Sequence, residues 1–240
     1  MALWSSVVLL GLAAFAVSLL AYMPAQFAVR QAGVAVDPAR VSGTIWQGKA
    51  RLDDTHSVDW ETSPLQSLRR MAVVVNWRII GPGTDLTGRV AVPLPPRADR
   101  AEIDAVTGNV AWSLVAAAIP DLAIACTARA DVSGLRLSLA PNRRSAEGSI
   151  TTQPGLCNRL DGSLPPVPAP ALRADLFTGD DGLKAVLTAA DAPQTPLATA
   201  RLTTLDQLIL TVHAAGAALV PGMPSSADSE IEVPLSALLP

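Results

Sequence analysis

Apolar and polar residues alternate along much of the chain, which is the pattern of half-buried β-strands. The clearest run covers residues 71–79, whose apolar positions are Met71, Val73, Val75, Trp77 and Ile79. The same alternation returns over residues 86–94, 122–132, 135–139 and 183–189. Because successive side chains of a strand point to opposite faces, these runs predict a sheet with one apolar and one polar face.

Glycines punctuate these runs. Short alternating segments open with Gly43, Gly88, Gly108, Gly134, Gly148 and Gly162. The intervals of 45, 20, 26, 14 and 14 residues are too irregular for a solenoid repeat. They fit successive hairpins in which each strand opens with a glycine that permits a positive φ, a bulge or a bend. We therefore predict an all-β fold with a curved, mainly antiparallel sheet of short, glycine-led strands.

Four segments depart from this pattern. Residues 113–119 predict a short helix, and residues 205–212 fit both helical and strand spacing, with strand favoured. The Pro-rich stretch 165–170 is a stiff spacer that could divide the β region. We expect one domain over residues 28–240, because each half alone carries few large apolar groups. Residues 224–240 are rich in Ser and Pro and are expected to be poorly ordered.

The N-terminus predicts a membrane anchor over residues 1–27. No charged residue precedes Arg30, and the apolar stretch from Leu3 to Met23 would span about 31 Å as a helix, the thickness of a bilayer core. Trp4 and Tyr22 would lie at the two interfaces, and Pro24 would end the helix. A cleaved signal peptide is the alternative, but it would need a basic n-region and a shorter apolar run.

The charges that flank the predicted anchor do not decide on which side of the membrane the β domain lies. Arg30 and Arg40 follow the predicted helix, which weakly favours a cytoplasmic domain. Cys126 and Cys157 are the only cysteines, and an isolated pair in an oxidising compartment usually forms a disulfide. The alternative is a reduced Cys126 in the core. We expect the disulfide, and with it an extracytoplasmic domain.

Composition and motifs argue against catalysis and nucleic-acid binding. Charged residues make up 16% of the chain and the net charge is −3, so a basic nucleic-acid surface is not expected. His56 and His213 lack metal-ligand spacing and are expected to be exposed. The acid pairs Asp53-Asp54 and Asp180-Asp181 are expected in solvated turns. We therefore expect no enzyme activity, no metal site and no cofactor.

Three of the five tryptophans crowd into 32 positions: Trp46, Trp60 and Trp77. Gly43 and Gly48 bracket the first of them, and Pro64 follows the second and turns the chain. Leu65 and Leu68 are then expected to re-enter the core. Whatever the function, this spacing predicts an aromatic cluster that closes the membrane-proximal end of the sheet.

The same segment resembles the N component of the type II secretion system, the general secretion pathway protein N family. That family has one N-terminal membrane helix, a Gly-Thr-apolar-Trp-x-Gly-x-Ala strand and a Trp-x-x-x-Pro-x-x-Leu segment. The matching positions in this chain are Gly43, Thr44, Ile45, Trp46, Gly48 and Ala50, then Trp60, Pro64 and Leu65 with a final Leu68. Trp77 completes the aromatic group at the end of the matched segment, whereas the Ala-rich C-terminal half matches poorly.

The resemblance implies a single-pass inner-membrane protein of a Gram-negative bacterium with a periplasmic β domain. It implies a non-catalytic accessory role in exporting folded proteins across the outer membrane, as a bridge between the inner-membrane platform and the outer-membrane secretin. Residues 3–23 would contact inner-membrane lipid. The alternative is an anchored β-groove protein that binds or transfers lipid, and an adhesion or scaffold module is a third class. A lipid groove should be open, apolar and free of charge, whereas a structural module should have a filled or covered concave face.

Overall fold

The computed structural model describes residues 11–12, 15, 18–19, 21–32, 37–94, 101–118, 124–140, 143–159, 165–180, 182–203, 207–219 and 227–234. Most of the predicted anchor, including Trp4, lies outside the described residues, as do Leu122, Gly162 and Leu205. No helix within the described ranges is long and apolar enough to cross a membrane.

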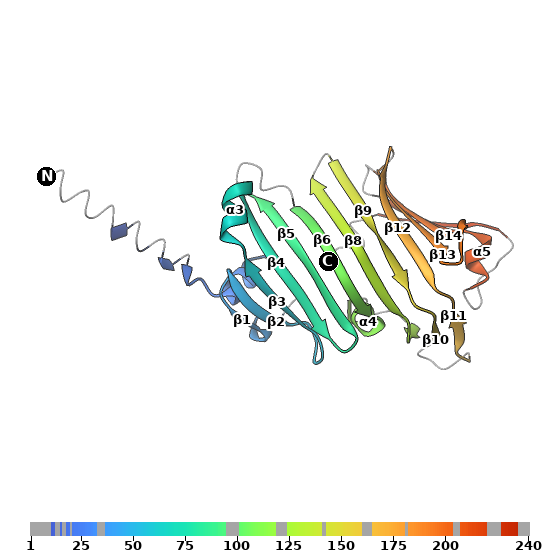
Figure 1. The fold of residues 1–240 in the computed structure, drawn as a ribbon, viewed down its shortest axis with the longest axis horizontal. Coiled ribbons are helices and arrows are strands. Elements are labelled where there is room, and N and C mark those ends of the chain that lie inside the picture. Colours follow the sequence, from blue (N-terminus) through green and yellow to red (C-terminus); the bar gives the residue numbers. More distant parts are fainter. Residues whose placement is uncertain are drawn as a thin grey trace.

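The strands of the main sheet are β1 (Val41–Gly43), β2 (Gln47–Arg51), β3 (Ser57–Thr62), β4 (Ala72–Gly81), β5 (Thr84–Pro93), β6 (Ala101–Ala111), β8 (Arg129–Ala140), β9 (Arg143–Thr152), β12 (Leu172–Gly179), β13 (Gly182–Ala189), β14 (Ala192–Leu202), β15 (Gln207–Val212) and β16 (Ser229–Pro234). These 13 strands form one sheet in the order β1-β2-β3-β4-β5-β6-β8-β9-β12-β13-β14-β15-β16. Every neighbouring pair is antiparallel. The all-β prediction is confirmed (Figure 1).

Smaller elements pack at the ends of this sheet. A second, 3-stranded sheet contains β7 (Ile124–Cys126), β10 (Gly155–Arg159) and β11 (Val167–Ala169), in the order β11-β10-β7. The helices are α2 (Ala25–Ala32), the 3-10 turn η1 (Pro38–Arg40), α3 (Pro64–Arg70), α4 (Trp112–Ala118) and α5 (Ala214–Ala217). The short helix predicted at residue 113 is confirmed as α4.

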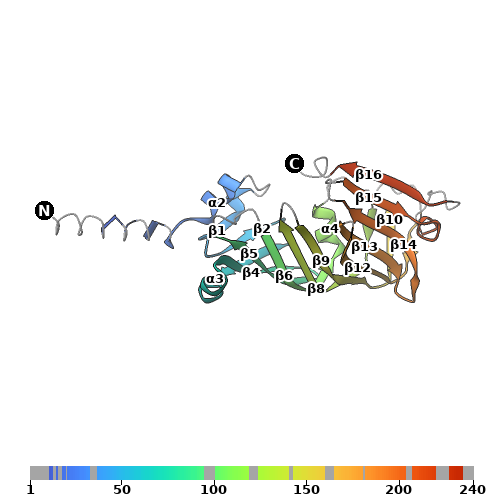
Figure 2. The ribbon, with the colours of Figure 1, turned by 90° about the horizontal axis from the view of Figure 1, so that it is seen from above.

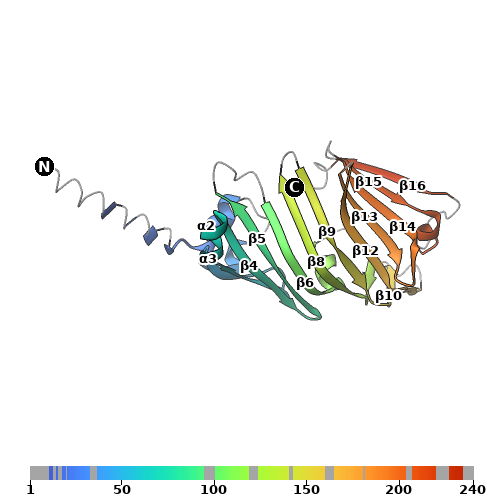
Figure 3. The same cartoon turned by 45° about the horizontal axis from the view of Figure 1, so that its top comes forward.

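The sheet is strongly curved. Figure 2 shows β15 and β16 folded back over the part of the sheet that contains β8, β9 and β12. Figure 3 shows the coiled strands that connect these two parts of the sheet. Glycine-centred irregularities help to produce this bending. The register shifts next to Gly108 and Gly134, and both residues have positive φ, at 131° and 59°. Bulges of this kind increase the local twist of a strand.

The structure corrects the expectation that glycines open the strands. Gly88, Gly134 and Gly148 lie inside β5, β8 and β9, because the bends occur within long strands rather than between short ones. Residues 207–212 form the favoured strand, β15. The expectation of poor order after residue 224 is wrong for residues 229–234, which form β16 by pairing with β15. The main sheet also continues across the Pro-rich stretch, because β9 pairs with β12.

Residues directly opposite each other on neighbouring strands share a face, so the register defines rows of side chains. One row, which we call the central row, passes through every strand and contains apolar residues, one Gly and one Ser. In sheet order it is Val41, Ala50, Val58, Ile79, Leu86, Gly108, Val132, Ile150, Ala174, Leu187, Ala198, Val212 and Ser229. We call the face that carries this row the apolar face.

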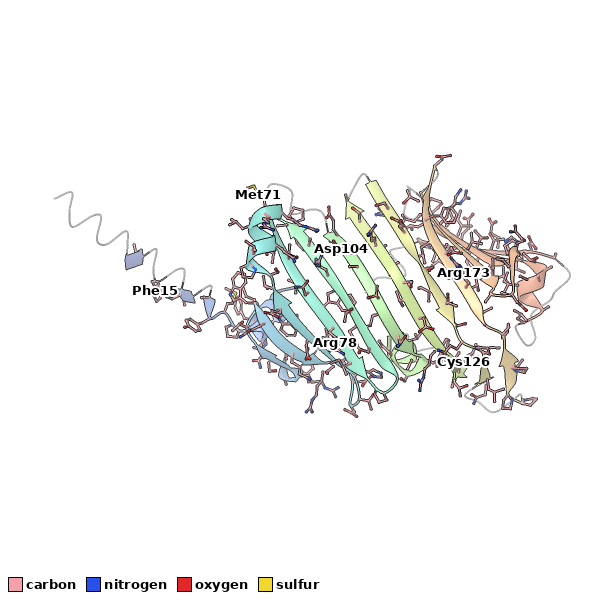
Figure 4. The ribbon with its side chains drawn as sticks, in the orientation of Figure 1. Phe15, Met71, Arg78, Asp104, Cys126 and Arg173 are labelled. Carbon is pink, nitrogen blue, oxygen red and sulfur yellow. A yellow bond between two sulfur atoms is a disulfide. The ribbon has the colours of Figure 1, made fainter. Side chains whose placement is uncertain are left out.

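The opposite face is polar. Its clearest row contains Ser42, Lys49, Asp59, Arg78, Thr87 and Thr107. Figure 4 shows Arg78, Asp104 and Arg173 on this face, turned toward the viewer. Helix α3 covers one corner of it, where Ala72, Val74 and Ala91 are buried together. The Ser67 hydroxyl at this corner accepts a hydrogen bond of 2.9 Å from the Val74 N–H.

Candidate functional site

The apolar face forms the concave inner side of the curved sheet. Val110 on β6 and Val212 on β15 are far apart in sheet order, yet they line the same cavity. The two arms of the sheet therefore face each other across this cavity, with the apolar face inside. On β4, β5, β8 and β13 the side chains on this face come from the alternating positions that the sequence predicted as apolar.

The next two rows on the same face, which both lie on one side of the central row, are also uncharged. One contains Gly48, Trp60, Trp77, Gly88, Val106, Leu135, Leu176, Ala185, Ala200, Leu210 and Ile231, and the other contains Thr62, Val75, Val90, Ile103, Leu137, Ala146, Leu183, Leu202, Leu208 and Val233. The row beyond these contains a charged residue, Arg144, which lies opposite Leu139. Most side chains of these rows are half-buried, so the described residues leave the apolar face partly open.

A cavity of about 570 Å³ lies at one end of the apolar face. Its walls come from β6, β8, β9 and β12–β15, and α4, α5 and the three-stranded sheet also border it. The apolar lining includes Trp112, Val115, Leu172, Leu187, Leu197, Ala198, Val212 and Leu219. Arg129, Thr152 and Asn158 are the polar or charged residues that border it. The sequence pattern indicated the strand positions, but no signal in it indicated that α4 and α5 close the space.

The Cys126–Cys157 disulfide borders this cavity. The two residues lie directly opposite each other on β7 and β10, with Cα atoms 4.1 Å apart. The predicted disulfide is therefore present in the structure, and it holds the three-stranded sheet together beside the cavity. Figure 4 shows Cys126 at the lower end of the sheet.

The tryptophans lie at the other end of the apolar face. Trp60 and Trp77 are directly opposite each other on β3 and β4. The Trp60 ring covers Gly48 and donates a hydrogen bond of 3.2 Å from Nε1 to the Thr44 carbonyl oxygen. The Trp77 ring covers Gly88, and its buried Nε1 has no hydrogen-bond partner among the described residues. These two rings form an aromatic pair at the N-terminal end of the sheet.

Trp46 occupies a different environment. It lies in the bend between β1 and β2 and is 36% exposed. The Thr44 hydroxyl accepts hydrogen bonds from the backbone N–H groups of Trp46 and Gln47, at 3.2 and 3.3 Å, and so holds this bend. Gly43, with φ at 93°, ends β1 at the start of the bend, where a Cβ atom would meet the Gln47 backbone.

Helix α3 carries an exposed apolar patch made of Leu65, Leu68 and Met71. Pro64 is the first residue of the helix, where its missing N–H costs nothing. Leu65 is 62% exposed, Leu68 79% and Met71 73%, so the expectation that the leucines re-enter the core is wrong. The helix packs on β4 through Ser67 instead, which turns its leucines outward. Figure 4 shows Met71 pointing away from the sheet next to α3.

Comparison with known proteins gives one match. The family model for type II secretion system (T2SS) protein N matches residues 35–219, which include Trp46, Trp60, Trp77, α3, the disulfide and the cavity. The chain belongs to this family. Neither a curated protein nor a solved structure shows significant similarity to the chain. The resemblance inferred from the segment Gly43 to Trp77 is therefore confirmed, because the matched family is the one that this segment resembles.

The two histidines of this chain each connect two parts of the fold through side-chain hydrogen bonds. His56 is 1% exposed, so the expectation that it is exposed is wrong. Its Nδ1 lies 2.7 Å from Asp53 Oδ2, and its Nε2 lies 3.5 Å from the Ser113 hydroxyl on α4. His213 has the same arrangement, with Asp228 Oδ2 at 2.8 Å and the Thr199 hydroxyl at 3.2 Å.

The order Asp53, His56, Ser113 is that of a hydrolase triad, but the packing opposes this function. The His56 ring lies against Gly81, where a Cβ atom would collide with Cδ2, and this leaves no space for a substrate. Partial burial raises the pKa of Asp53, but hydrogen bonds from the N–H groups of Thr55 and His56 and from the His56 ring outweigh it and hold that pKa well below its usual range. The group is a charged structural tie between the β2–β3 turn and α4.

Groups of three or more His, Cys, Asp or Glu side chains arranged for a metal ion do not occur within the described residues. Asp53 is bound into its turn by backbone N–H groups, and the neighbouring Asp54 side chain is 96% exposed. Asp180 is exposed at the β12–β13 turn, whereas Asp181 lies outside the described residues. The candidate site of this family member is thus the apolar face with its cavity, together with the exposed patch on α3.

Proposed function

We propose that this chain is a non-catalytic accessory component of the type II secretion system. In this proposal residues 1–27 anchor it in the inner membrane of a Gram-negative bacterium, and residues 28–240 form one periplasmic β domain. The domain binds other secretion components and bridges the inner-membrane platform and the outer-membrane secretin. Membership of the protein N family supports the secretion role.

The exposed patch on α3 is the observation that supports a binding role. Leu65, Leu68 and Met71 present large apolar side chains to solvent in the segment that holds the family motif. Exposed apolar groups that gather at one place are typical of protein interaction sites. Arg69, in the last turn of the helix, adds a positive charge beside them. A secretion component with an apolar groove and an acidic rim would complement this patch.

Cross-linking and secretion assays in intact cells test this role. We expect Leu65→Asp with Leu68→Asp to abolish cross-links between this chain and other secretion components and to reduce export of folded proteins. The matched control is Leu156→Asp, because Leu156 is 51% exposed on β10, far from α3 in the sequence. Normal cross-links and export in the α3 variant would show that the patch is not the binding site.

The disulfide supports the placement of the domain in an oxidising compartment. Cys126 and Cys157 are bonded, and stable disulfides form in the periplasm rather than the cytosol. The charges of Arg30 and Arg40 point weakly the other way, and two charges are a small signal beside a formed disulfide.

A lipid-binding or lipid-transfer function is the second candidate, because one specific observation favours it. The central row and the next two rows of the apolar face are uncharged and mostly half-buried, which is what an open lipid groove requires. A purely structural module would bury this face under another layer. If the chain transfers lipid, purified protein should accelerate exchange of labelled phospholipid between vesicles, and no acceleration would exclude transfer.

A further inference from the structure

The cavity beside the disulfide has the size and lining of a small-molecule site. Its volume of about 570 Å³ lies within the usual range for ligand pockets, about 300–1,000 Å³. Leu187 and Ala198 come from one arm of the sheet, and Val110 comes from the other. Val115 on α4 and Leu219, just after α5, add apolar side chains to the lining. An apolar, flexible ligand would gain contacts on every side.

The residues that line the cavity carry almost no charge. No carboxylate is among the described lining residues, and Arg129 is the one charged residue among them. Arg129 lies opposite Ala111 in the register, on the polar face, and its guanidinium lies near Gly83 in a small polar pocket that also contains Asp85 and Asp131. The side chains that face the cavity are therefore uncharged, which suits an alkyl chain.

The central row connects the cavity with the N-terminal end of the domain. It begins at Val41, which is buried together with Ala25 of α2, and it reaches Ala198 and Val212 in the cavity lining. No charged side chain lies in this row, so an alkyl chain could occupy it without displacing a solvated ion. The cavity is therefore continuous, along one apolar face, with the end of the domain that follows the predicted membrane segment.

We propose that the cavity binds the acyl chain of a membrane lipid. This binding site does not depend on the secretion role, because it uses none of the α3 residues. The occupant differs from a protein partner in one respect that can be measured. An acyl chain would enter a cavity lined by apolar side chains, whereas a peptide would need hydrogen-bonding groups for its backbone, and the lining offers few.

Photolabelling of the full chain tests the site. The chain is reconstituted in vesicles of phosphatidylethanolamine and phosphatidylglycerol, and a palmitic acid analogue with a diazirine on its chain is the probe. After irradiation and digestion, mass spectrometry should find label in peptides that contain α4 and β14. Label confined to residues 1–24, with none in these peptides, would overturn the proposal.

A pair of variants on β14 separates the cavity from the rest of the apolar face. Ala198 lines the cavity, whereas Ala200 lies on the same strand and face and is not among the lining residues. Ala198→Phe should lower labelling of the α4 peptide about tenfold by filling the cavity, and Ala200→Phe should leave it unchanged. Both must keep the wild-type melting temperature, and Val115→Trp replaces Ala198→Phe if that variant does not fold. Equal labelling of Ala198→Phe and the wild-type protein would exclude this site.

A third variant tests whether the apolar lining, rather than the nearby charge, holds the acyl chain. Because the Arg129 guanidinium lies on the polar face, Arg129→Ala should leave labelling of the α4 peptide by the diazirine acid unchanged. A severalfold loss of labelling in this variant would show that charge at Arg129, and not the apolar lining, holds the probe. Because the α3 variants test secretion and these variants test lipid binding, either proposal can fail without the other.

Discussion

Trp60 and Trp77 lie directly opposite each other on β3 and β4, and each indole covers a glycine on the next strand outward. Gly48 on β2 and Gly88 on β5 complete this row of four residues. A Cβ atom at either glycine would collide with the ring above it. The glycines thus let two large rings lie flat on the sheet, which explains why tryptophan and glycine occur together in this segment.

We expect Gly88→Ala to destabilise the fold by about 1–3 kcal/mol, because the new methyl group displaces the Trp77 ring. Urea unfolding followed by tryptophan fluorescence measures the change. Thr87→Ala, at the adjacent exposed position on the polar face, should change stability by no more than about 0.5 kcal/mol. The loss should shrink when Trp77 is also replaced by Leu. A loss that stays the same without the ring would mean that the ring contact is not its cause.

The hydrogen bonds that hold the Asp53 carboxylate should make stability depend on pH in the acid range. The pKa of Asp53 is held below its usual range in the folded chain, against about 3.9 when unfolded. Its contribution is therefore complete above about pH 5 and is lost as the pH falls through the folded pKa. We expect Asp53→Asn to be less stable than wild type at pH 7, with a difference that shrinks below about pH 4.

Asp54→Asn is the matched control for this experiment. The Asp54 side chain is 96% exposed and its contact with Arg40 is 3.9 Å long, so its loss should have almost no effect at any pH. Urea unfolding between pH 3 and pH 7 compares the three proteins. A constant difference between Asp53→Asn and wild type over this range would show that Asp53 does not titrate with a lowered pKa.

The strand pattern was predictable because alternation is a local property. The apolar positions from Val73 to Ile79 fall on the apolar face in the structure, as their spacing predicted. Residues 207–212 form a strand because pairing with β14 and β16 decides between two local patterns that were nearly equal. The C-terminal strand β16 could not be predicted, since Ser and Pro near it indicate poor order and only its partner stabilises it.

The candidate site was predictable only in part. Cys126 and Cys157 are bonded as expected, because an isolated pair has one partner available. Leu65 and Leu68 were placed in the core because they are apolar, but the contact that packs α3 is made by Ser67. His56 was placed at the surface because histidine is polar, yet Asp53 and Ser113 satisfy both ring nitrogens in the interior. Specific hydrogen bonds, which the alternation of apolar and polar residues does not encode, decided both cases.

The first 24 residues contain no charged side chain, so we expect the chain to remain in the membrane pellet after carbonate extraction. Replacing Leu9 and Leu12 by Arg should release it, because each charge near the centre of a membrane helix costs about 2.5–3.5 kcal/mol on insertion scales. Leu65→Arg, outside the predicted anchor, is the control and should not release it. Immunoblotting of pellet and supernatant distinguishes these results, and a wild-type chain found in the supernatant would mean that no anchor is retained.

The Cys126–Cys157 bond should stabilise the fold substantially. It closes a loop with a sequence separation of 31, and chain entropy alone then predicts about 3.7 kcal/mol of stabilisation. The core is thin, since the fully buried side chains of greatest volume are His56, Val41 and Val74. Such a core cannot easily replace this contribution. We therefore expect Cys126→Ala with Cys157→Ala to lower the urea midpoint clearly, as measured by tryptophan fluorescence. Reduction of the wild-type protein should lower it equally, and an unchanged midpoint in both would show that the three-stranded sheet holds together without the bond.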